Sequence, residues 1–420
     1  MKIGYLIQLA EEIRKPPYSG PANHVRQVVL ELARRGHEVR TLFRFENKIW
    51  KSDDLQVFER ASPTPLDRGV LRLIEKASRR LQSELHLTYL AFFESLRFAL
   101  ACRQELAGCQ ILFERLSWMA YGGQLAARWL KIPWVLEYNG NPLHDLEAKG
   151  IAPAGFQRKI AETITRVGLR SADHVAATGE GWRSSCVSEW GVLPEKVTTV
   201  ENGSGLTRLL HTGQLRAFQV DRSPDRPVQL VYLGGFYPWH GVDILLRAVS
   251  RALNQGTCLK LVMIGSGHGF EEAKRLADEL GIGIWVSFRG QLTVEEYASI
   301  LAESDIGLSP YCGWREYSGL KLFDYKAAGL GIIASGEEGN PATLEHGRTG
   351  WIVPPCDEDA LLAAILQLSA DHDLCKKMGR SARLEAEKLH GWDRTVEKLE
   401  QIFTASLAGK QAALPNEGAK

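Results

Sequence analysis

The stretch SPYCGWREYSGLKLFDYKAAGLGIIAS, residues 309–335, indicates the fold of this chain. An apolar run that stops at Pro310 predicts the end of a strand, and the apolar spacing over residues 320–328 predicts a helix that ends at Gly329. Residues 331–335 predict a second strand. A strand, a loop, a helix and a strand in this order form one unit of a parallel α/β sheet. The loop before the helix lies where such sheets bind ligands.

The start of this helix carries groups that suit an anion. The backbone amides of Ser318, Gly319 and Leu320 would donate at the positive end of the helix dipole, and a glycine lets a ligand approach the backbone closely. Lys321 adds a positive charge in the first turn, where a cation is unfavourable unless a negative ligand compensates it. We therefore expect an anionic ligand at this loop.

Two carboxylates, Glu316 and Asp324, lie eight positions apart and flank the same site. Each could accept hydrogen bonds from hydroxyl groups of a ligand, although each charge alone is also typical of a solvated helix face. With them, SGLKLFDYKAAGLGIIAS resembles SPLKLFEYMAAGLPVIAS, a form of the signature of the family-4 retaining glycosyltransferases. In that family, two glutamates separated by seven residues bracket a helix start that holds the diphosphate of a nucleotide sugar. Here Asp324 replaces the second glutamate, and Gly319 and Gly331 replace prolines.

The resemblance implies an α/β protein with the GT-B fold. This fold has two Rossmann-like domains with doubly wound parallel sheets that face each other across a cleft, and a C-terminal helix that crosses back to the first domain. The expected parts are listed in chain order: an N-terminal acceptor-binding domain at 1–205, a linker at 206–227, a C-terminal domain for the nucleotide sugar at 228–390, a crossover helix at 391–408, and a disordered tail at 409–420.

Composition excludes several classes of protein. The chain has 420 residues, 45% hydrophobic and 24% charged, which is ordinary for two globular domains. A net charge of +1 gives no reason to expect nucleic acid as a partner. The seven cysteines are scattered and form no C-x-x-C pair, so we expect a reducing compartment, no disulfide framework and no metal site. We find no run of about 18 apolar residues and no signal-peptide pattern, and we expect a cytoplasmic protein.

The first domain opens with a strand at 3–9, a helix at 21–35 and a strand at 38–43, the order of a doubly wound fold. Gly20 lies between the first strand and the helix, where the family places a glycine-rich loop that faces the donor phosphates. A simple turn glycine is an equally good explanation.

Three residues of the first domain are expected on the acceptor side of the cleft. Arg115, Glu137 and Asn139 lie at the ends of two predicted strands, and the segments around them resemble the ERxS and IPxVLExN segments of one branch of the family. Many relatives carry a histidine in the first of these loops that touches the donor sugar. This chain has Glu114 and Arg115 there and no histidine, which leaves that role unassigned.

The second domain repeats the pattern of strand, glycine turn and helix. Gly235 and His240 stand where the family has an arginine and a lysine that bind phosphates. His240 could still donate a hydrogen bond to an anion, most fully if protonated. Gly265 lies in another glycine turn. The backbone of Arg289 and Gly290 lies where the family reads the edge of the nucleobase.

Residues 67–107 are helical in pattern and combine basic with apolar side chains. A basic amphipathic helix can lie on an anionic membrane, so a peripheral contact at the inner face of a membrane is one interpretation. A solvated surface helix is the other, and it is the commoner case. The basic residues are Arg68, Arg72, Lys76, Arg79 and Arg80.

Taken with the resemblance, these features predict a glycosyltransferase of the hexosyltransferase type. It would move a sugar from a nucleoside diphosphate sugar to an acceptor hydroxyl of a glycan, a polysaccharide or a lipid-linked molecule, with retention and without a metal or another cofactor. Glu316 would hold the donor sugar, Asp324 the ribose, and Lys321 and His240 the diphosphate. Two alternatives stay open: a sugar-nucleotide epimerase, and a non-catalytic subunit that binds a nucleotide sugar.

Overall fold

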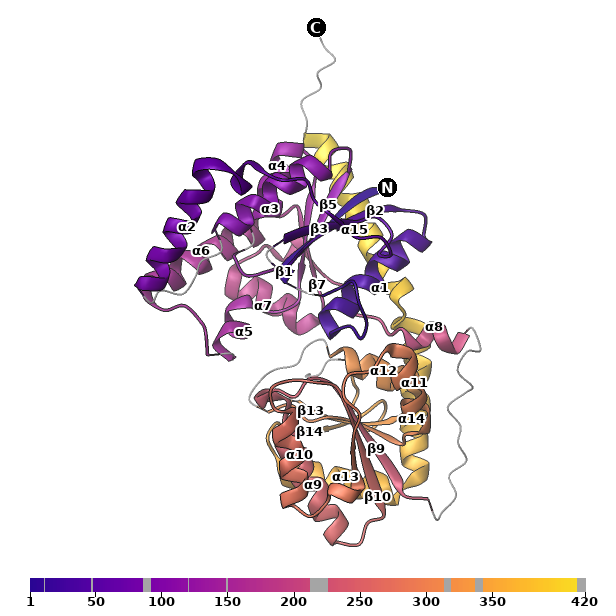
Figure 1. Cartoon of the computed structure of the whole chain (residues 1–420). Coiled ribbons are helices and arrows are strands. Elements are labelled where there is room, and N and C mark those ends of the chain that lie inside the picture. The colour runs from indigo at the N-terminus through magenta and orange to yellow at the C-terminus, as the bar shows by residue number, and fades with distance from the viewer. Residues whose placement is uncertain are drawn as a thin grey trace. The chain divides into compact units, whose positions relative to one another are not determined.

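The computed structural model of the chain describes residues 1–10, 12–46, 48–85, 92–119, 121–148, 150–211, 226–312, 319–336 and 343–413. These residues form two compact units, each built on its own sheet (Figure 1). The first unit comprises Met1–Lys15, Pro21–Val200 and the chain from Val396 on. The second unit comprises Pro16–Gly20 and Glu201–Thr395.

Within the described residues, the first unit has an eight-stranded sheet in the order β4-β3-β2-β1-β5-β6-β7-β8. From β2 to β8 in this order, neighbouring strands pair in parallel, and most of their apolar residues are buried, as in a sheet covered by helices. β3 and β4 add an antiparallel edge that the sequence pattern did not predict. The strands are β1 (Lys2–Ala10), β2 (Glu38–Phe45), β3 (Lys48–Ser52), β4 (Glu59–Arg60), β5 (Ile111–Arg115), β6 (Trp134–Tyr138), β7 (His174–Ala177) and β8 (Val197–Thr199).

Helices of the first unit pack on this sheet through apolar stripes. In α1, Val25, Val28 and Leu32 recur at helical spacing and are fully buried. In α15, Phe403 is fully buried and its ring lies 5.3 Å from that of Phe113 on β5, so the C-terminal part of α15 belongs to this unit. The helices are α1 (Gly20–Arg34), α2 (Gly69–Glu84), α3 (Phe92–Glu105), α4 (Gly122–Leu130), α5 (Pro142–Ala148), α6 (Gly155–Ser171), α7 (Glu180–Trp190) and α15 (Trp392–Ala413).

The second unit has a six-stranded sheet in the order β11-β10-β9-β12-β13-β14, counted over the described ranges. Its neighbouring strands all pair in parallel. This order doubles back at β9, as in a doubly wound sheet. The strands are β9 (Val228–Leu233), β10 (Leu259–Ile264), β11 (Val286–Phe288), β12 (Ile306–Ser309), β13 (Gly331–Ser335) and β14 (Trp351–Val353).

Two apolar clusters cover the two faces of this sheet. One cluster includes buried residues of α9, α10 and α13, and the other includes buried residues of α11, α12 and α14. The expected architecture of two parallel-sheet α/β domains is therefore confirmed. The helices are α8 (Leu206–His211), α9 (Val242–Asn254), α10 (Phe270–Glu279), α11 (Val294–Glu303), α12 (Leu320–Ala328), α13 (Glu358–Ala370) and α14 (His372–Leu389). No helix among the described residues is long and apolar enough to cross a lipid bilayer.

The ends of the expected segments differ from the structure in two places. The linker expected at 206–227 begins with a helix, α8, because Leu206 is apolar and packs fully buried in the core of the second unit. Residues 212–225 of that linker lie outside the described residues. Residues 409–413 of the expected tail belong to α15, which continues through Ala413, and residues 414–420 lie outside the described residues.

The expectation that the chain has no disulfide is wrong. Cys312, after β12, and Cys356, after β14, form a disulfide with a Cα–Cα distance of 4.7 Å. The pair is separated by 44 residues in sequence, and nothing in its spacing marks it. The two cysteines meet because β12, β13 and β14 are neighbours that all end at the same edge of the sheet.

Candidate functional site

The switch point of the second sheet lies between β9 and β12. The chain leaves β9 toward β10 on one side and returns to β12 on the other. Sheets of this kind bind ligands outside the carboxyl ends of the strands at such a point. The turns after β9, β10, β11 and β12, with the start of α12, are therefore the candidate site, here named the switch-point site.

Glycines in these turns let neighbouring backbones touch. Gly265 has a φ of +135°, and a Cβ atom on it would lie 1.8 Å from the carbonyl oxygen of Gly234. Gly241 has a φ of +60°, and its Cβ would lie 1.9 Å from the carbonyl oxygen of Pro310. Any side chain at these two positions would push adjoining turns apart, which explains why glycine stands there.

The predicted residues near the nucleobase lie in an adjoining turn. The N–H of Gly265 donates to the carbonyl of Gly290 at 2.7 Å, and the N–H of Arg289 donates to the carbonyl of Met263 at 2.9 Å. The turn after β11 is thus fixed against the turn after β10. The structure brings Gly235, Gly265 and Gly290 together, while the side chain of Arg289 is exposed.

Lys321 provides the positive charge of the switch-point site. Its Nζ lies 4.8 Å from the ring centroid of Tyr232 and 4.7 Å from that of Tyr311, and aromatic faces attract a cation. A Cβ atom on Gly234 would lie 2.8 Å from this Nζ. The ammonium group is therefore held in the first turn of α12 beside the turn after β9. That position fits the predicted contact with a diphosphate, which stays a prediction.

His240 is neutral in this environment. Burial, and after it the charge of Lys321, lowers the pKa of His240 to about 3. Its Nδ1–H donates to the carbonyl of Gly235 at 2.5 Å, so Nε2 is the acceptor that faces the hydroxyl of Tyr311 at 3.2 Å. The charged form of His240 would be buried next to another cation, so protonation does not strengthen a hydrogen bond from this residue here. Its contact with a ligand stays a prediction.

Asp324 is bound by protein hydroxyls. Its Oδ1 accepts from Ser204 at 2.6 Å and its Oδ2 accepts from Tyr297 at 2.9 Å. The side chain is buried, and burial raises its pKa to about 6. The predicted contact with a ribose stays untested, and the structure gives Asp324 a second role that sequence reasoning missed.

Two predicted residues, Glu316 and Ser318, lie outside the described residues, so their roles stay predictions. Gly319 is buried and precedes α12, and its carbonyl accepts the N–H of Leu322 at 2.9 Å. A Cβ atom on Gly20 would lie 3.4 Å from Leu320 Cδ1. Gly20 is thus placed beside the start of α12, and its contact with the donor phosphates stays a prediction.

The predicted residues of the first unit form a second cluster at the ends of β5 and β6, here named the β5–β6 cluster. Arg115 Nη1 donates to Asn139 Oδ1 at 3.2 Å and lies 3.7 Å from Glu137 Oε2. Glu137 also forms a buried ion pair with His24 and accepts from the hydroxyl of Tyr5 at 3.2 Å. Burial alone would raise the pKa of Glu137, but His24 and Arg115 lower it to about 2.

His24 is the member of the β5–β6 cluster that sequence reasoning missed. It lies in the first two turns of α1 and is 2% exposed. A single histidine in an amphipathic helix gives no signal by itself. Glu114, by contrast, belongs to a different environment, because successive residues of a strand face opposite sides. Glu114 is fully buried, accepts from Trp134 Nε1 at 2.8 Å, and burial raises its pKa to about 7.

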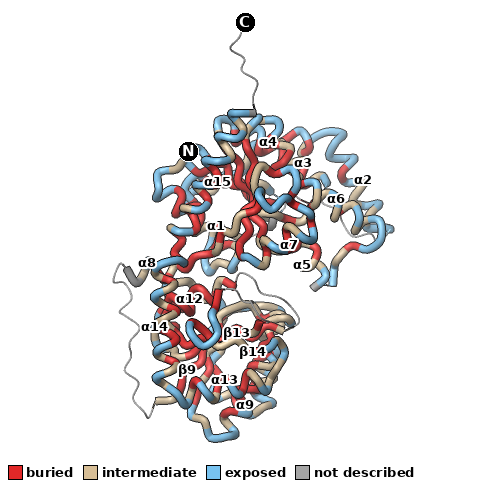
Figure 2. Tube along the Cα trace, turned by 180° about the vertical axis from the view of Figure 1, so that it is seen from behind, coloured by how far each residue is buried: buried red, intermediate tan, exposed pale blue. Residues whose placement is uncertain are grey.

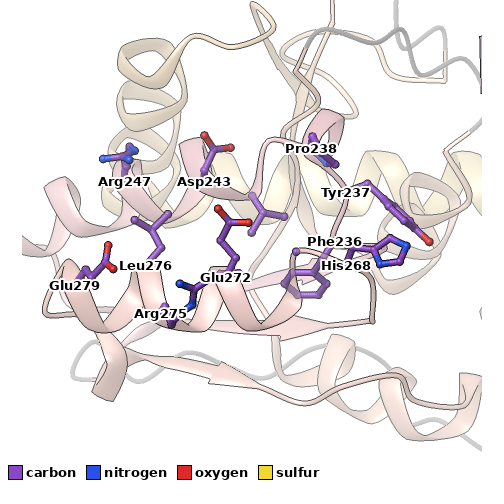
Figure 3. Close-up of a pocket in the computed structure, with 13 residues that line it drawn as sticks. Phe236, Tyr237, Pro238, Asp243, Arg247, His268, Glu272, Arg275, Leu276 and Glu279 are labelled. Carbon is purple, nitrogen blue, oxygen red and sulfur yellow. The ribbon is translucent and has the colours of Figure 1, made fainter. Parts of the chain in front are cut away.

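A pocket of about 600 Å³ lies between α9 and α10 (Figure 3). In the close-up, Leu276 lies among charged side chains of both signs, which come from α9 and α10. None of the predicted site residues lines it, but Phe236, Tyr237 and His268 belong to the turns after β9 and β10, so this pocket adjoins the switch-point site. Its lining residues include Phe236, Tyr237, Val242, Asp243, Arg247, His268, Glu272, Arg275 and Glu279.

The chain contains two Asp-x-Asp tripeptides, a pattern that can hold Mg²⁺ beside a diphosphate, at 357–359 and 371–373. In both, the first aspartate caps a helix. Asp357 accepts the N–H of Ala360 at 2.8 Å, and Asp371 accepts the N–H of Leu374 at 2.9 Å. Their position before α13 and α14 explains them as N-caps.

Comparisons with known families and proteins agree with this fold. Residues 19–203 match the family described as "Glycosyl transferase 4-like domain", and residues 214–385 match "Glycosyl transferases group 1". The chain is 28% identical over 273 residues to a D-inositol 3-phosphate glycosyltransferase of Streptomyces bingchenggensis (strain BCW-1), an alignment that covers 62% of this chain and 58% of that protein. The chain thus spans less than two thirds of the length of this curated relative.

Other relatives are more distant or match a shorter part. A GDP-mannose-dependent alpha-(1-6)-phosphatidylinositol monomannoside mannosyltransferase of Mycobacterium tuberculosis (strain ATCC 25618 / H37Rv) is 29% identical over 195 residues, which cover 45% of this chain and 50% of that protein. The structure of a sucrose-phosphate synthase from Thermosynechococcus elongatus superposes with a TM-score of 0.71 at 21% identity, over 97% of this chain and 100% of that chain. That of Anabaena Alr3699/HepE in complex with UDP does so with a TM-score of 0.64 at 15% identity, over 96% of this chain and 100% of that chain. These structures show a shared fold.

Proposed function

We propose that this chain, which carries a glycosyl transferase 4-like domain followed by a domain of the glycosyl transferases group 1, transfers a sugar from a nucleoside diphosphate sugar to an acceptor hydroxyl. One observation carries the proposal. At the switch point of the second sheet, Lys321 holds a buried positive charge in the first turn of α12, between Tyr232 and Tyr311. A cation there is favourable when an anionic ligand lies at the helix start.

The diphosphate is the group that these residues would serve. When the bond between the sugar and the diphosphate breaks, negative charge grows on the diphosphate oxygen that leaves. Lys321 and the amides at the start of α12 stabilise that charge, and Glu316 holds the hydroxyls of the donor sugar. Removing one such charged donor typically costs about 3 kcal/mol of transition-state stabilisation, or two to three decades in rate. The transfer proceeds with retention and without a metal.

The relatives suggest the chemistry of donor and acceptor. A similar structure is described in complex with UDP and another with UDP-glucose, which supports a nucleoside diphosphate sugar as the donor. Curated relatives are named for the transfer of sugars to inositol 3-phosphate and to a phosphatidylinositol mannoside, which supports a glycan or a lipid-linked molecule as the acceptor. A peripheral membrane contact through residues 67–107 would suit a lipid-linked acceptor.

Thermal shift with a panel of ligands tests the donor site. UDP, GDP, ADP, their sugars and NAD are added in turn, without metal and then with Mg²⁺. We expect one nucleoside diphosphate and its sugar to raise the melting temperature without metal. Lys321→Met should remove most of that shift, whereas Lys274→Met should keep it, because Lys274 lies on α10 outside the switch-point site and pairs with Glu271. A response to NAD alone would contradict the proposal.

A transfer assay then separates the proposal from its alternatives. The sugar nucleotide that stabilises the protein is incubated with and without glycan and lipid-linked acceptors. Release of the nucleoside diphosphate that depends on an acceptor supports transfer, and the anomeric configuration of the product tests retention. Conversion of the donor alone to an isomer would indicate an epimerase. Binding without any turnover would indicate a non-catalytic subunit, which the neutral His240 and the missing arginine at Gly235 would explain.

A further inference from the structure

Helix α2 presents its apolar side chains to solvent. Val70, Leu73, Ile74, Leu81 and Leu85 recur at helical spacing, which places them on one face, and each is at least 50% exposed. Among the described residues of α2, Glu75 is the one that is buried. Exposed residues run along α2 at the edge of the first unit (Figure 2). The apolar face of this helix therefore stabilises nothing within the described chain.

Charged side chains attach α2 to the rest of the first unit. Glu75 forms ion pairs with Arg79 on the same helix and with Arg97 on α3. Arg79 also pairs with Glu94 on α3. A surface helix normally buries its apolar stripe and exposes its charges. α2 does the opposite. Its contacts with α3 leave a continuous apolar surface of about four turns free for another partner.

The charges beside the apolar face limit what that partner can be. Residues 68–85 contain five basic and two acidic residues, a net charge of +3. Arg68, Arg72 and Lys76 are exposed, and within the described ranges none of them forms an ion pair. Two copies of the chain that met through this face would bring like charges together. A negatively charged partner with an apolar interior suits the surface better.

From this arrangement we infer that α2 lies on the surface of an anionic lipid bilayer. Its apolar face enters the boundary between headgroups and acyl chains, and its basic residues contact the lipid phosphates and other anionic headgroups. Helices with a basic side, a separate apolar face and low mean hydropathy bind membranes in this way. A fluid surface also fits a convex helix that offers no groove. The inference rests on α2 alone and not on the proposed sugar transfer.

Sedimentation with vesicles tests the inference on the full chain. Vesicles of phosphatidylcholine with about 30% of the anionic lipid phosphatidylglycerol are compared with vesicles of phosphatidylcholine alone, at low and at high salt. We expect binding to the anionic vesicles at low salt and its loss at high salt, because the charges are screened. Equal binding to both kinds of vesicle, or binding to neither, would overturn the inference.

Two variants and two controls separate the apolar face from the charges. The double variant Leu73→Gln/Ile74→Gln should reduce binding to anionic vesicles at least tenfold, and Arg72→Gln/Lys76→Gln should reduce it by about fivefold per charge. Ile284→Gln removes an apolar side chain of the second unit that is 88% exposed, and Lys377→Gln/Lys388→Gln removes two exposed charges of α14. Neither control should change binding.

Folding and self-association are checked on the same variants. All four side chains changed on α2 are exposed, so the melting temperatures should stay within a few degrees of that of the native chain. Light scattering reports the oligomeric state. A dimer that dissociates in Leu73→Gln/Ile74→Gln would mean that a second copy covers the face, and it would overturn the inference.

Discussion

At the scale of single residues, the switch-point site depends on atoms that nearly touch. Lys321 lies between two tyrosine rings, and the space for its ammonium group exists because residue 234 has no side chain. Gly234 in turn lies against Gly265. A substitution at either glycine would therefore displace the ammonium group of Lys321, although neither glycine needs to contact a ligand.

Replacing Gly265 by alanine tests this dependence. The new Cβ would lie 1.8 Å from the carbonyl oxygen of Gly234, in a backbone region that L residues rarely adopt. We expect Gly265→Ala to lower the free energy of unfolding by at least about 2 kcal/mol and to weaken nucleotide binding. Gly409→Ala is the control, because nothing lies within 4 Å of its Cβ and it sits within α15. Urea unfolding and thermal shift measure the two effects, and equal stability of both variants would refute the argument.

Asp324 predicts a dependence of stability on pH. Its folded-state pKa of about 6 lies above the usual value of 3.8, so the native state binds a proton that the unfolded chain releases between these values. This contribution to stability is therefore present at low pH and is lost as the pH rises through 6. Between pH 5 and pH 7 the native chain should lose about 1.4 kcal/mol relative to Asp324→Asn.

Urea unfolding of both chains over this pH range checks the sign. Tyr297→Phe removes one of the two donors to the carboxylate, so its loss between pH 5 and pH 7 should be larger. If the native and Asp324→Asn curves run parallel, burial does not shift the carboxyl group as described. Nucleotide affinity is also measured on Asp324→Asn, since the loss of a contact between this carboxylate and a ribose would lower it.

At the scale of elements, periodicity predicted most of the parallel strands and their helices. The strand at β12, the helix at α12, the left-handed Gly329 after it and the strand at β13 all follow from the apolar pattern of one stretch. The antiparallel β3 and β4 were missed, because β4 has two residues and β3 alternates only weakly. α8 was missed for a similar reason, since six residues give no helical period.

For the candidate site, the sequence indicates which strand-end residues lie close together, but it does not indicate which side chains from other segments bind them. Arg115, Glu137 and Asn139 come together because their strands are neighbours in the sheet. His24 joins them from a helix that lies far away in sequence, and Ser204 reaches Asp324 from another segment altogether. Such contacts depend on side chains brought together only by the fold, and one sequence contains no sign of them.

The disulfide between Cys312 and Cys356 predicts a redox effect on the second unit. It joins the ends of β12 and β14 over 44 residues, so Cys356→Ser should lower the free energy of unfolding by up to about 4 kcal/mol in the chain-entropy estimate. Dithiothreitol should lower the melting temperature of the native chain and leave that of Cys356→Ser unchanged. Cys258→Ser is the control, because Cys258 is free and exposed. Titration of the denatured, unreduced chain should find five thiols, and seven would show that no disulfide forms.

At the scale of the whole molecule, the division into two units does not follow the order of the chain at α15. The helix begins with Trp392 in the second unit, and from Val396 on it belongs to the first. Four of its apolar residues, Val396, Leu399, Ile402 and Phe403, are buried. The resemblance implied a helix that returns to the first domain, and these residues give the physical reason, since their apolar surface is removed from water there.

Replacing Phe403 by alanine should therefore destabilise the first unit, although residue 403 follows the second unit in sequence. Phe403 is fully buried against Phe113, and loss of such a side chain costs about 3–5 kcal/mol. Hydrogen exchange followed by mass spectrometry locates the effect, because local and sub-global opening is reported by the amides concerned. Amides of β1 and β5 should lose protection in Phe403→Ala, whereas amides of β9 and β12 should keep it. Thr404→Ala, an exposed change on the same helix, should leave both sheets as they are. If protection fell equally in both sheets, the chain would unfold as one cooperative body, and the assignment of α15 to the first unit would carry no separate energetic meaning.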